Sequence, residues 1–206
     1  MTKNLIIDWI PFEVDKRVIN EAVNHGGPVK VSGVLQRSDA KNHNGRVYPH
    51  LILEREADKY NLEFVKDRRA MGELDHPDSS VVSIKNVSHI VTEMRWEGKD
   101  LIGTCEILST PTGNILKELL KAGVKLGISS RGLGSVDERA DGTIMVQEDF
   151  ELIAFDFVSN PSTQGAFQLP VSRGLNEAVN KTFGLTHQNN IYRKTEELIR
   201  DILTEI

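Results

Sequence analysis

The chain has little cysteine, no excess of positive charge and no long hydrophobic run. Its single cysteine, Cys105, excludes an internal disulfide and suits a reducing cytoplasm. No segment reaches the roughly 18 consecutive apolar residues that a membrane-spanning helix requires. A net charge of −5 leaves no basic excess to displace counterions from a nucleic acid. We therefore expect neither a nucleic acid nor a membrane as a partner.

The 206 residues suffice for one globular domain with tails, or at most for two small domains. Hydrophobic residues make up 39% of the chain, which is enough to build a core. The first eight residues are too short a stretch, and become acidic too early, for a secretory signal peptide. These features are typical of a globular protein of the cytoplasm.

Hydrophobic patterning predicts many strands and few helices. Apolar and polar residues alternate at residues 29–36, 87–96, 101–108, 124–132 and 150–158. A tight turn between the second and third of these segments predicts a β-hairpin. Apolar residues at spacings of three and four predict helices at 50–66 and 112–122, the second capped by Gly123. We expect an α+β fold whose core is a β-barrel surrounded by helices.

A glycine-flanked strand, LGISSRG at residues 126–132, carries two adjacent serines. Side chains alternate between the two faces of a strand, so Ser129 and Ser130 are expected to point in opposite directions. Ser130 shares the face of Leu126 and Ile128, which belongs in the core. Ser129 is then expected to face outward, where a substrate can reach it. Ser129 is therefore the preferred nucleophile, and Ser130 is the alternative.

The segment GELDHP at residues 72–77 places His76 before a proline and among carboxylates. A histidine can take the proton of a serine, so His76 and Ser129 together supply the essential parts of a serine hydrolase. A third residue must orient the imidazole and stabilise its charged form. Asp156 is preferred, because the alternation of its strand puts it on the outer face, as with Ser129. The alternatives for this third role are Asp75 and Asp78.

Two other kinds of active site have weaker support. A metal-dependent hydrolase would use Glu73, Asp75, His76 and Asp78, but their spacing fits no strong metal motif, so no metal is expected. Cysteine catalysis would require Cys105. Its neighbours on the same strand face are mostly apolar, so we expect a small, buried hydrophobic residue there.

The histidine and serine segments resemble those of the prohead core proteases of contractile-tailed bacteriophages, which are relatives of the herpesvirus maturation protease assemblin. The most specific stretch is GISSRGLGS at residues 127–135. The histidine segment fits the family moderately well. Two further stretches also fit, NGRVYP at residues 44–49 and residues 156–162. The resemblance covers about residues 29–165.

This resemblance implies a serine endopeptidase inside the phage procapsid, which is assembled in the host cytoplasm. Such an enzyme cuts scaffold or core proteins and the major capsid protein during head maturation, and it also cuts itself. Its acyl-transfer chemistry needs no cofactor, and self-association into dimers or rings is compatible with the setting. A non-catalytic scaffold or core protein of the capsid is the alternative.

The identity of the third catalytic residue separates this chain from the herpesvirus relatives. The resemblance implies His76 and Ser129 as two members, and the herpesvirus enzymes use a second histidine as the third. This chain has no histidine between Ser129 and His187, which lies in the tail. That departure favours Asp156.

One hexapeptide occurs twice, as INEAVN at residues 19–24 and as LNEAVN at residues 175–180. The resemblance implies cleavage after the glutamate of (Leu/Ile)-x-Glu-(Ala/Gly), so each copy is a candidate site of self-cleavage. The predicted cuts lie between Glu21 and Ala22 and between Glu177 and Ala178. They divide the chain into a leader, 1–21, a protease domain, 22–177, and a tail with an amphipathic helix, 178–206.

Arg131 and Gly132 follow the two serines directly. Arg131 is expected on the face of Ser129, where it could bind the glutamate that precedes the cut bond or help to hold the oxyanion. The backbone N–H groups of Arg131 and Gly132 are the predicted oxyanion donors. A glycine at position 132 also lets a second backbone approach closely.

Overall fold

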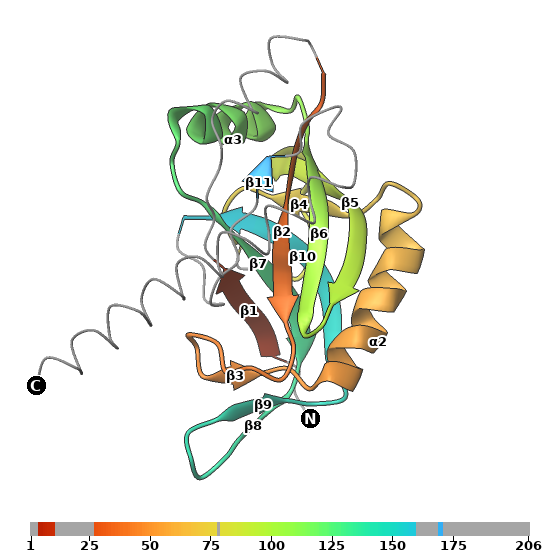
Figure 1. Cartoon of the computed structure of the whole chain (residues 1–206), viewed down its shortest axis with the longest axis vertical. Coiled ribbons are helices and arrows are strands. Elements are labelled where there is room, and N and C mark those ends of the chain that lie inside the picture. Colours follow the sequence, from red (N-terminus) through yellow and green to blue (C-terminus); the bar gives the residue numbers. More distant parts are fainter. Residues whose placement is uncertain (1–3, 11–26, 78, 160–168, 171–206) are drawn as a thin grey trace, which may run out of the picture. The chain divides into compact units, whose positions relative to one another are not determined.

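The structure is a computed structural model that describes residues 4–10, 27–77, 79–159 and 169–170 (Figure 1). None of the helices in these ranges is long and apolar enough to cross a membrane. The elements in chain order are β1 (Asn4–Ile10), β2 (Val29–Arg37), β3 (Arg46–Val47), α2 (His50–Tyr60), the π-helical turn η1 (Asn61–Val65), β4 (Met71–Glu73), the 3₁₀ turn η2 (Ile84–Asn86), β5 (Val87–Glu97), β6 (Asp100–Ile107), α3 (Pro111–Ala122), β7 (Gly127–Gly134), β8 (Val136–Glu138), β9 (Ile144–Val146), β10 (Glu151–Val158) and β11 (Leu169–Pro170).

The strands form three sheets in the described part of the chain. The largest has the order β11-β2-β6-β5-β4, and its centre is the predicted hairpin of β5 and β6. A second sheet has the order β1-β7-β10, with antiparallel pairing on both sides of β7. A small third sheet joins β3, β9 and β8. The α+β class is confirmed.

The expected closed barrel is wrong for the described residues, because the ladder of hydrogen bonds is not continuous between the two larger sheets. They meet where β4 ends beside β10. There a single parallel bridge joins Leu74 to Phe157, and the Asp75 N–H donates to the Phe157 carbonyl at 2.7 Å. This junction places the residues that follow β4 directly beside β10.

The two predicted helices are confirmed, with small differences at their ends. Helix α2 packs on β10, where the ring of Tyr60 contacts that of Phe155 edge-on at 5.7 Å between centroids. The last predicted turn of that helix is the π-helical η1. Helix α3 begins at a Thr110 cap, whose hydroxyl accepts from the Gly113 N–H, and it ends at Gly123 with φ of 75°. A left-handed residue at that position favours glycine.

The short strands β3, β4, β8, β9 and β11 lie outside the predicted strand segments, and two further differences concern the sheet that carries the serines. The strand that carries the serines begins at Gly127, three residues later than expected. The first strand, β1, was not predicted at all, because the first 27 residues have the pattern of a leader. It pairs with β7 along its whole length, from Asn4 opposite Gly134 to Ile10 opposite Ile128. A segment of the predicted leader is thus an edge strand of the β1-β7-β10 sheet.

His89 of β5 forms a buried hydrogen bond to the backbone of β10. The ring is fully buried, its Nε2–H donates to the Phe155 carbonyl at 3.0 Å, and its Nδ1 lies 2.9 Å from the Ser88 hydroxyl. Burial lowers the pKa of His89 to about 4, because the charged imidazolium would lose its hydration. The ring is therefore neutral at physiological pH.

The lowered pKa of His89 predicts a loss of stability in mild acid. An unfolded histidine with a pKa near 6.5 binds a proton more readily than folded His89, so this contribution is complete above about pH 6.5. It declines as the pH falls from about 6.5 to about 4, by about 3 kcal/mol in total. Urea unfolding of wild type and His89→Gln across this range measures the difference. Parallel pH profiles for the two proteins would contradict the prediction.

Gly72 in β4 permits the close approach of β4, β5 and β10. A Cβ at this position would lie 2.1 Å from the Phe155 carbonyl oxygen and 2.3 Å from His89 Nε2. We expect Gly72→Ala to lower the free energy of unfolding by about 3 kcal/mol, since overpacking against backbone cannot relax easily. The matched control is Gly98→Asn, where a Cβ meets nothing within 4 Å and asparagine tolerates the φ of 61°. Equal urea midpoints for the two variants would refute this account of Gly72.

Candidate active site

Ser129 and Asp156 are direct neighbours on adjacent strands of the β1-β7-β10 sheet. In the antiparallel pair of β7 and β10, Ser129 stands opposite Asp156 and Ser130 stands opposite Phe155. The other serine belongs to a different environment, because the Ser130 hydroxyl accepts a hydrogen bond from Gln36 Nε2 at 2.7 Å. Cross-strand partners project to the same face of a sheet, so Ser129 and Asp156 share a face, as the alternation pattern predicted. That face is buried, so the prediction that Asp156 lies on the outer face is wrong.

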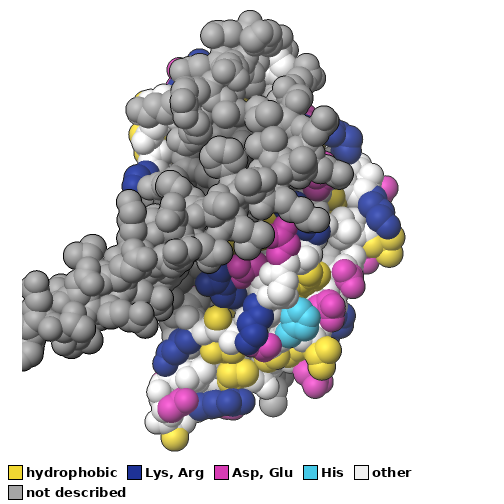
Figure 2. Space-filling view, viewed as in Figure 1, with side chains coloured by type: hydrophobic (Ala, Val, Ile, Leu, Met, Phe, Trp, Pro, Cys, Tyr) yellow, Lys and Arg dark blue, Asp and Glu magenta, His cyan; other side chains and the backbone are white. Residues whose placement is uncertain are grey.

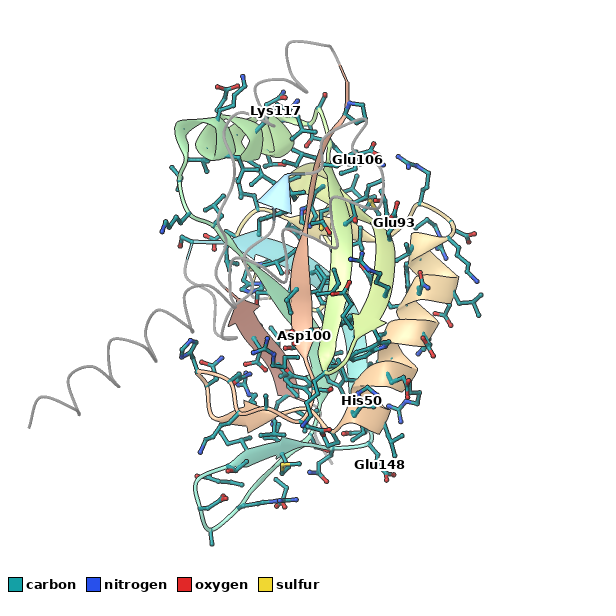
Figure 3. The ribbon with its side chains drawn as sticks, viewed as in Figure 1. His50, Glu93, Asp100, Glu106, Lys117 and Glu148 are labelled. Atoms are coloured by element: carbon teal, nitrogen blue, oxygen red, sulfur yellow. The ribbon has the colours of Figure 1, made fainter. Side chains whose placement is uncertain are left out.

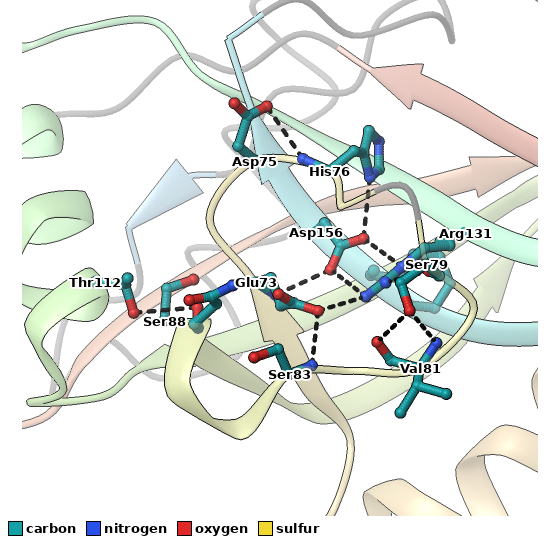
Figure 4. A network of polar contacts seen from close by, with 12 residues as sticks. Glu73, Asp75, His76, Ser79, Val81, Ser83, Ser88, Thr112, Arg131 and Asp156 are labelled. Carbon is teal, nitrogen blue, oxygen red and sulfur yellow. Dashed lines mark hydrogen bonds and ion pairs between the residues drawn. The ribbon is translucent and has the colours of Figure 1, made fainter.

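His76 reaches this face from the loop after β4. The Leu74 bridge and the left-handed turn at Asp75, with φ of 71°, direct the chain back over β10. The His76 ring then lies with its Nδ1 3.0 Å from the Asp156 carboxylate (Figure 4). The histidine side chain is 17% exposed, whereas Asp156 is fully buried. An imidazole held at Nδ1 by a carboxylate presents its Nε2 for proton transfer.

Of the two candidate acids that the structure describes, Asp156 contacts the His76 ring and Asp75 contacts the His76 backbone. The Asp75 carboxylate instead accepts the backbone N–H of His76, at 3.1 Å. Asp78 lies outside the described residues. Another histidine in the described part, His50, lies at the start of α2 and contacts Ser38 (Figure 3). The His76 ring therefore contacts Asp156 and not Asp75, the two candidate acids that the structure describes.

Arg131 is enclosed in a buried cluster with two carboxylates. Its guanidinium lies 3.0 Å from the Asp156 carboxylate and 3.1 Å from Glu73, and all three side chains are at most 1% exposed (Figure 4). It also donates to the Ser79 carbonyl at 2.8 Å. Asp156 accepts a further bond from the Glu73 backbone N–H at 2.9 Å. The guanidinium is thus already engaged on the protein's own acids.

Ser129 is not exposed, and that expectation is wrong. Its side chain is fully buried because β1 lies against the edge of β7, where Trp9 pairs with Ser129 and Asp8 pairs with Ser130. The Ser129 hydroxyl donates to the backbone carbonyl of Asp8. His76 Nε2 is buried and has no hydrogen-bond partner among the residues that the structure describes. The serine and the histidine therefore share a face, but the serine proton is held by the strand β1.

The structure gives physical reasons for two further expectations, which concern Gly132 of β7 and Cys105 of β6. A Cβ at Gly132 would lie 2.4 Å from the Phe150 ring and 2.7 Å from the Glu151 carbonyl, so a close approach of β10 requires glycine there. Cys105 is fully buried in the core, and burial raises its pKa, so it is the inert hydrophobic residue that we expected. Within the described residues no group of three or more His, Cys, Asp and Glu side chains has metal-binding geometry.

Sequence reasoning missed the acidic residue of β1, Asp8, which pairs with Ser130 and whose backbone carbonyl accepts from the Ser129 hydroxyl. Asp8 is fully buried, and its nearest side-chain partners come from the stretch of residues 44–48. The only signal in the sequence is the similarity of that stretch to a known family, which says nothing of Asp8. The predicted cleavage residues Glu21, Ala22, Glu177 and Ala178 lie outside the described residues.

Comparisons with known proteins identify the family of this chain. A family model described as "Prohead core protein serine protease" matches residues 4–177. The chain is 34% identical over 143 residues to the prohead core protein protease of Enterobacteria phage T4, a match that covers 68% of each protein. It is also similar to the solved structure of the bacteriophage T4 capsid assembly protease gp21, with a TM-score of 0.64 and 25% identity over 81% of this chain and 97% of that one. The chain therefore belongs to the prohead core protein serine protease family.

Proposed function

We propose that this protein is a serine endopeptidase that cleaves scaffold or core proteins and the major capsid protein inside the phage procapsid, where it also cleaves itself. The observation that carries the proposal is the buried Asp156–His76 pair on the face of Ser129. The family match supports a protease of capsid maturation. The described surface in Figure 2 mixes acidic and basic side chains, as expected for a protein that acts on other proteins.

The proposed reaction is acyl transfer. His76 Nε2 takes the proton of Ser129 as its oxygen attacks the carbonyl carbon of the substrate, and Asp156 holds the imidazolium that forms. Backbone N–H groups near Arg131 and Gly132 hold the oxyanion. His76 then gives its proton to the departing amine. A water molecule, activated by the same histidine, hydrolyses the ester and restores Ser129.

Arg131 takes a different part from the one expected of its side chain. Because the guanidinium is paired with Glu73 and Asp156, it fixes the latter carboxylate beside His76. We therefore assign Arg131 as a positioning residue for Asp156. Asp156 occupies the place that a second histidine takes in the herpesvirus enzymes, and kinship with them stays a prediction.

The proposed self-cleavage sites follow Glu21 and Glu177, within the repeated hexapeptide. These cuts would leave residues 22–177 as the mature protease. They would also remove β1, which covers Ser129 in this structure. Assembly inside the procapsid, in the cytoplasm of the host, would supply both the substrates and the neighbouring copies of the enzyme.

Self-cleavage of the purified full chain tests the nucleophile. We expect the wild-type protein to lose residues 1–21 and 178–206 at neutral pH, and Ser129→Ala to stay intact, because Ser129 shares a face with Asp156, which His76 contacts. Intact mass spectrometry measures both products. The matched control is Ser130→Ala, which should still be cut. Trimming of Ser129→Ala at the wild-type rate would overturn the assignment, and an intact wild-type chain that also spares a Leu-Asn-Glu-Ala peptide would favour the non-catalytic scaffold.

Asp156→Asn tests the orienting acid. We expect kcat for a Leu-Asn-Glu-Ala peptide to fall by about 1,000-fold or more, because an amide cannot stabilise the imidazolium. The free energy of unfolding should also fall by about 3 kcal/mol, since Arg131 loses one of its two buried partners.

Asp75→Asn is the control for this experiment, since asparagine also tolerates the left-handed backbone at that position. Its kcat should remain within about threefold of wild type, because Asp75 contacts the backbone of His76 and not the ring. Equal losses in the two variants would remove the distinction between the two acids.

A further inference from the structure

A second polar cluster lies around the Asp8 carboxylate, and the proposed reaction does not use it. One carboxylate oxygen accepts from Asn44 Nδ2 at 2.8 Å and from Arg46 Nη1 at 3.0 Å. The other accepts from the Tyr48 hydroxyl. Asp8 is fully buried, Tyr48 is 1% exposed, and the Arg46 side chain is 24% exposed. We call Asn44, Arg46 and Tyr48 the carboxylate pocket.

The carboxylate pocket is built by one short stretch of chain. Arg46 lies in β3 and Tyr48 follows that strand directly, while Asn44 lies in the turn before Gly45, whose φ is 76°. Asn42 fixes this stretch, because its side-chain oxygen accepts the backbone N–H groups of Asn44 and Arg46, each at 2.9 Å. These bonds fix the backbone of Asn44 and Arg46, whose side chains also donate to the Ile7 carbonyl of β1, at 3.1 and 2.7 Å respectively.

The chemistry of the carboxylate pocket suits an anionic side chain. Burial and the neighbouring Asp8 carboxylate raise the pKa of Tyr48 well above its usual value, so the phenol stays protonated and acts as a donor. Arginine supplies a fixed positive charge and the asparagine amide a further donor. Three donors with no acidic member recognise a carboxylate much better than a neutral amide.

Asp8 links this pocket to Ser129. Its side chain fills the carboxylate pocket, while its backbone carbonyl accepts the Ser129 hydroxyl proton. In acyl transfer, the residue whose carbonyl meets the nucleophile is the residue before the scissile bond. Strand β1 thus lies along β7 in the manner of an extended substrate, with an acidic residue at the position where the proposed cleavage sites have glutamate.

We propose that Asn44, Arg46 and Tyr48 bind the glutamate side chain that precedes the scissile bond, and that β1 occupies the same site as an internal, substrate-like strand. The inference deepens the proposed function and rests on it for the identity of Ser129 as nucleophile. Arg131 does not serve this purpose, because Glu73 and Asp156 already neutralise it. Departure of β1 frees the edge of β7, and a substrate segment then adds to the sheet in its place.

Peptide cleavage by the full-length chain tests the pocket. We compare two peptides with the sequence of residues 172–181, one with glutamate at the cleaved position and one with glutamine. Arg46→Gln should lower kcat/KM for the glutamate peptide by about 100-fold and leave the glutamine peptide within about threefold, so that the preference collapses. Arg46→Lys keeps the positive charge but lacks the two-pronged guanidinium. Its kcat/KM for the glutamate peptide should lie between those of wild type and Arg46→Gln.

A matched arginine on the surface provides the control. Arg68 forms an exposed ion pair with Glu106 of β6, and Arg68→Gln should keep the wild-type preference. A wild-type preference for glutamate that survives Arg46→Gln, in a protein that still cleaves, would overturn the pocket and leave the proposed function intact.

Binding without catalysis separates the two proposals. In full-length Asp8→Ala/Ser129→Ala, calorimetry with acetyl-Gly-Leu-Asn-Glu should give a Kd about tenfold or more below that of acetyl-Gly-Leu-Asn-Gln. Adding Arg46→Gln, or the milder Tyr48→Phe if the first fails to fold, should remove or reduce the difference. The Ser129→Ala chain with Asp8 intact should bind the glutamate peptide more weakly, because β1 competes for the site.

Equal Kd values for the two peptides in Asp8→Ala/Ser129→Ala would refute the carboxylate pocket. A preserved glutamate preference in binding, together with unchanged self-cleavage in Ser129→Ala, would instead uphold the pocket and refute the nucleophile. Unchanged affinity on restoring Asp8 would show that β1 is not a competitor and would overturn that half of the proposal.

Discussion

The central constraint in this molecule is the placement of one guanidinium between two buried carboxylates. Glu73 ends β4 and Asp156 lies in β10, and both are out of contact with water. Two neighbouring buried anions would repel each other strongly, so Arg131 of β7 must lie between them. A buried ion cluster contributes little net stability compared with apolar packing, but its directional contacts fix three segments in one arrangement. That arrangement brings the loop after β4, and with it His76, over the face of β7.

The fold could be predicted only where the evidence is local. Residues 87–107 alternate on both sides of a tight turn, and the periodic residues of 112–122 end at Gly123, so the hairpin and helix α3 were expected. The absence of a closed barrel could not be predicted. Closure of a barrel depends on whether β4 and β10 pair through a continuous row of backbone hydrogen bonds or meet at a single bridge. The periodicity of the sequence carries no information on this pairing. Strand β1 was missed for a similar reason, because its strand structure depends on pairing with residues more than a hundred positions away.

The candidate site shows the same division. Alternation alone put Ser129 and Asp156 on a common face, and the register of β7 and β10 agrees. The choice of Asp156 over Asp75 followed from the same argument and from a family resemblance, and the contact with the His76 ring supports it. What alternation cannot report is what lies across the sheet edge. Ser129 was therefore expected to be accessible, and Arg131 to be available for a substrate, although β1 covers the first and two acids neutralise the second.

The position of β1 has a kinetic consequence that differs from that of a separate inhibitor. A strand tethered to the same chain has a high effective concentration at its site, and this concentration does not change when the protein is diluted or crowded. On the proposed mechanism, a peptide substrate competes with a strand whose local concentration is not lowered by dilution of the protein. Severing the tether converts the strand into a free peptide at the concentration of the enzyme itself. On this view the proposed cut in the leader is irreversible. Each molecule passes only once from a form in which tethered β1 competes with the substrate to a form in which it does not.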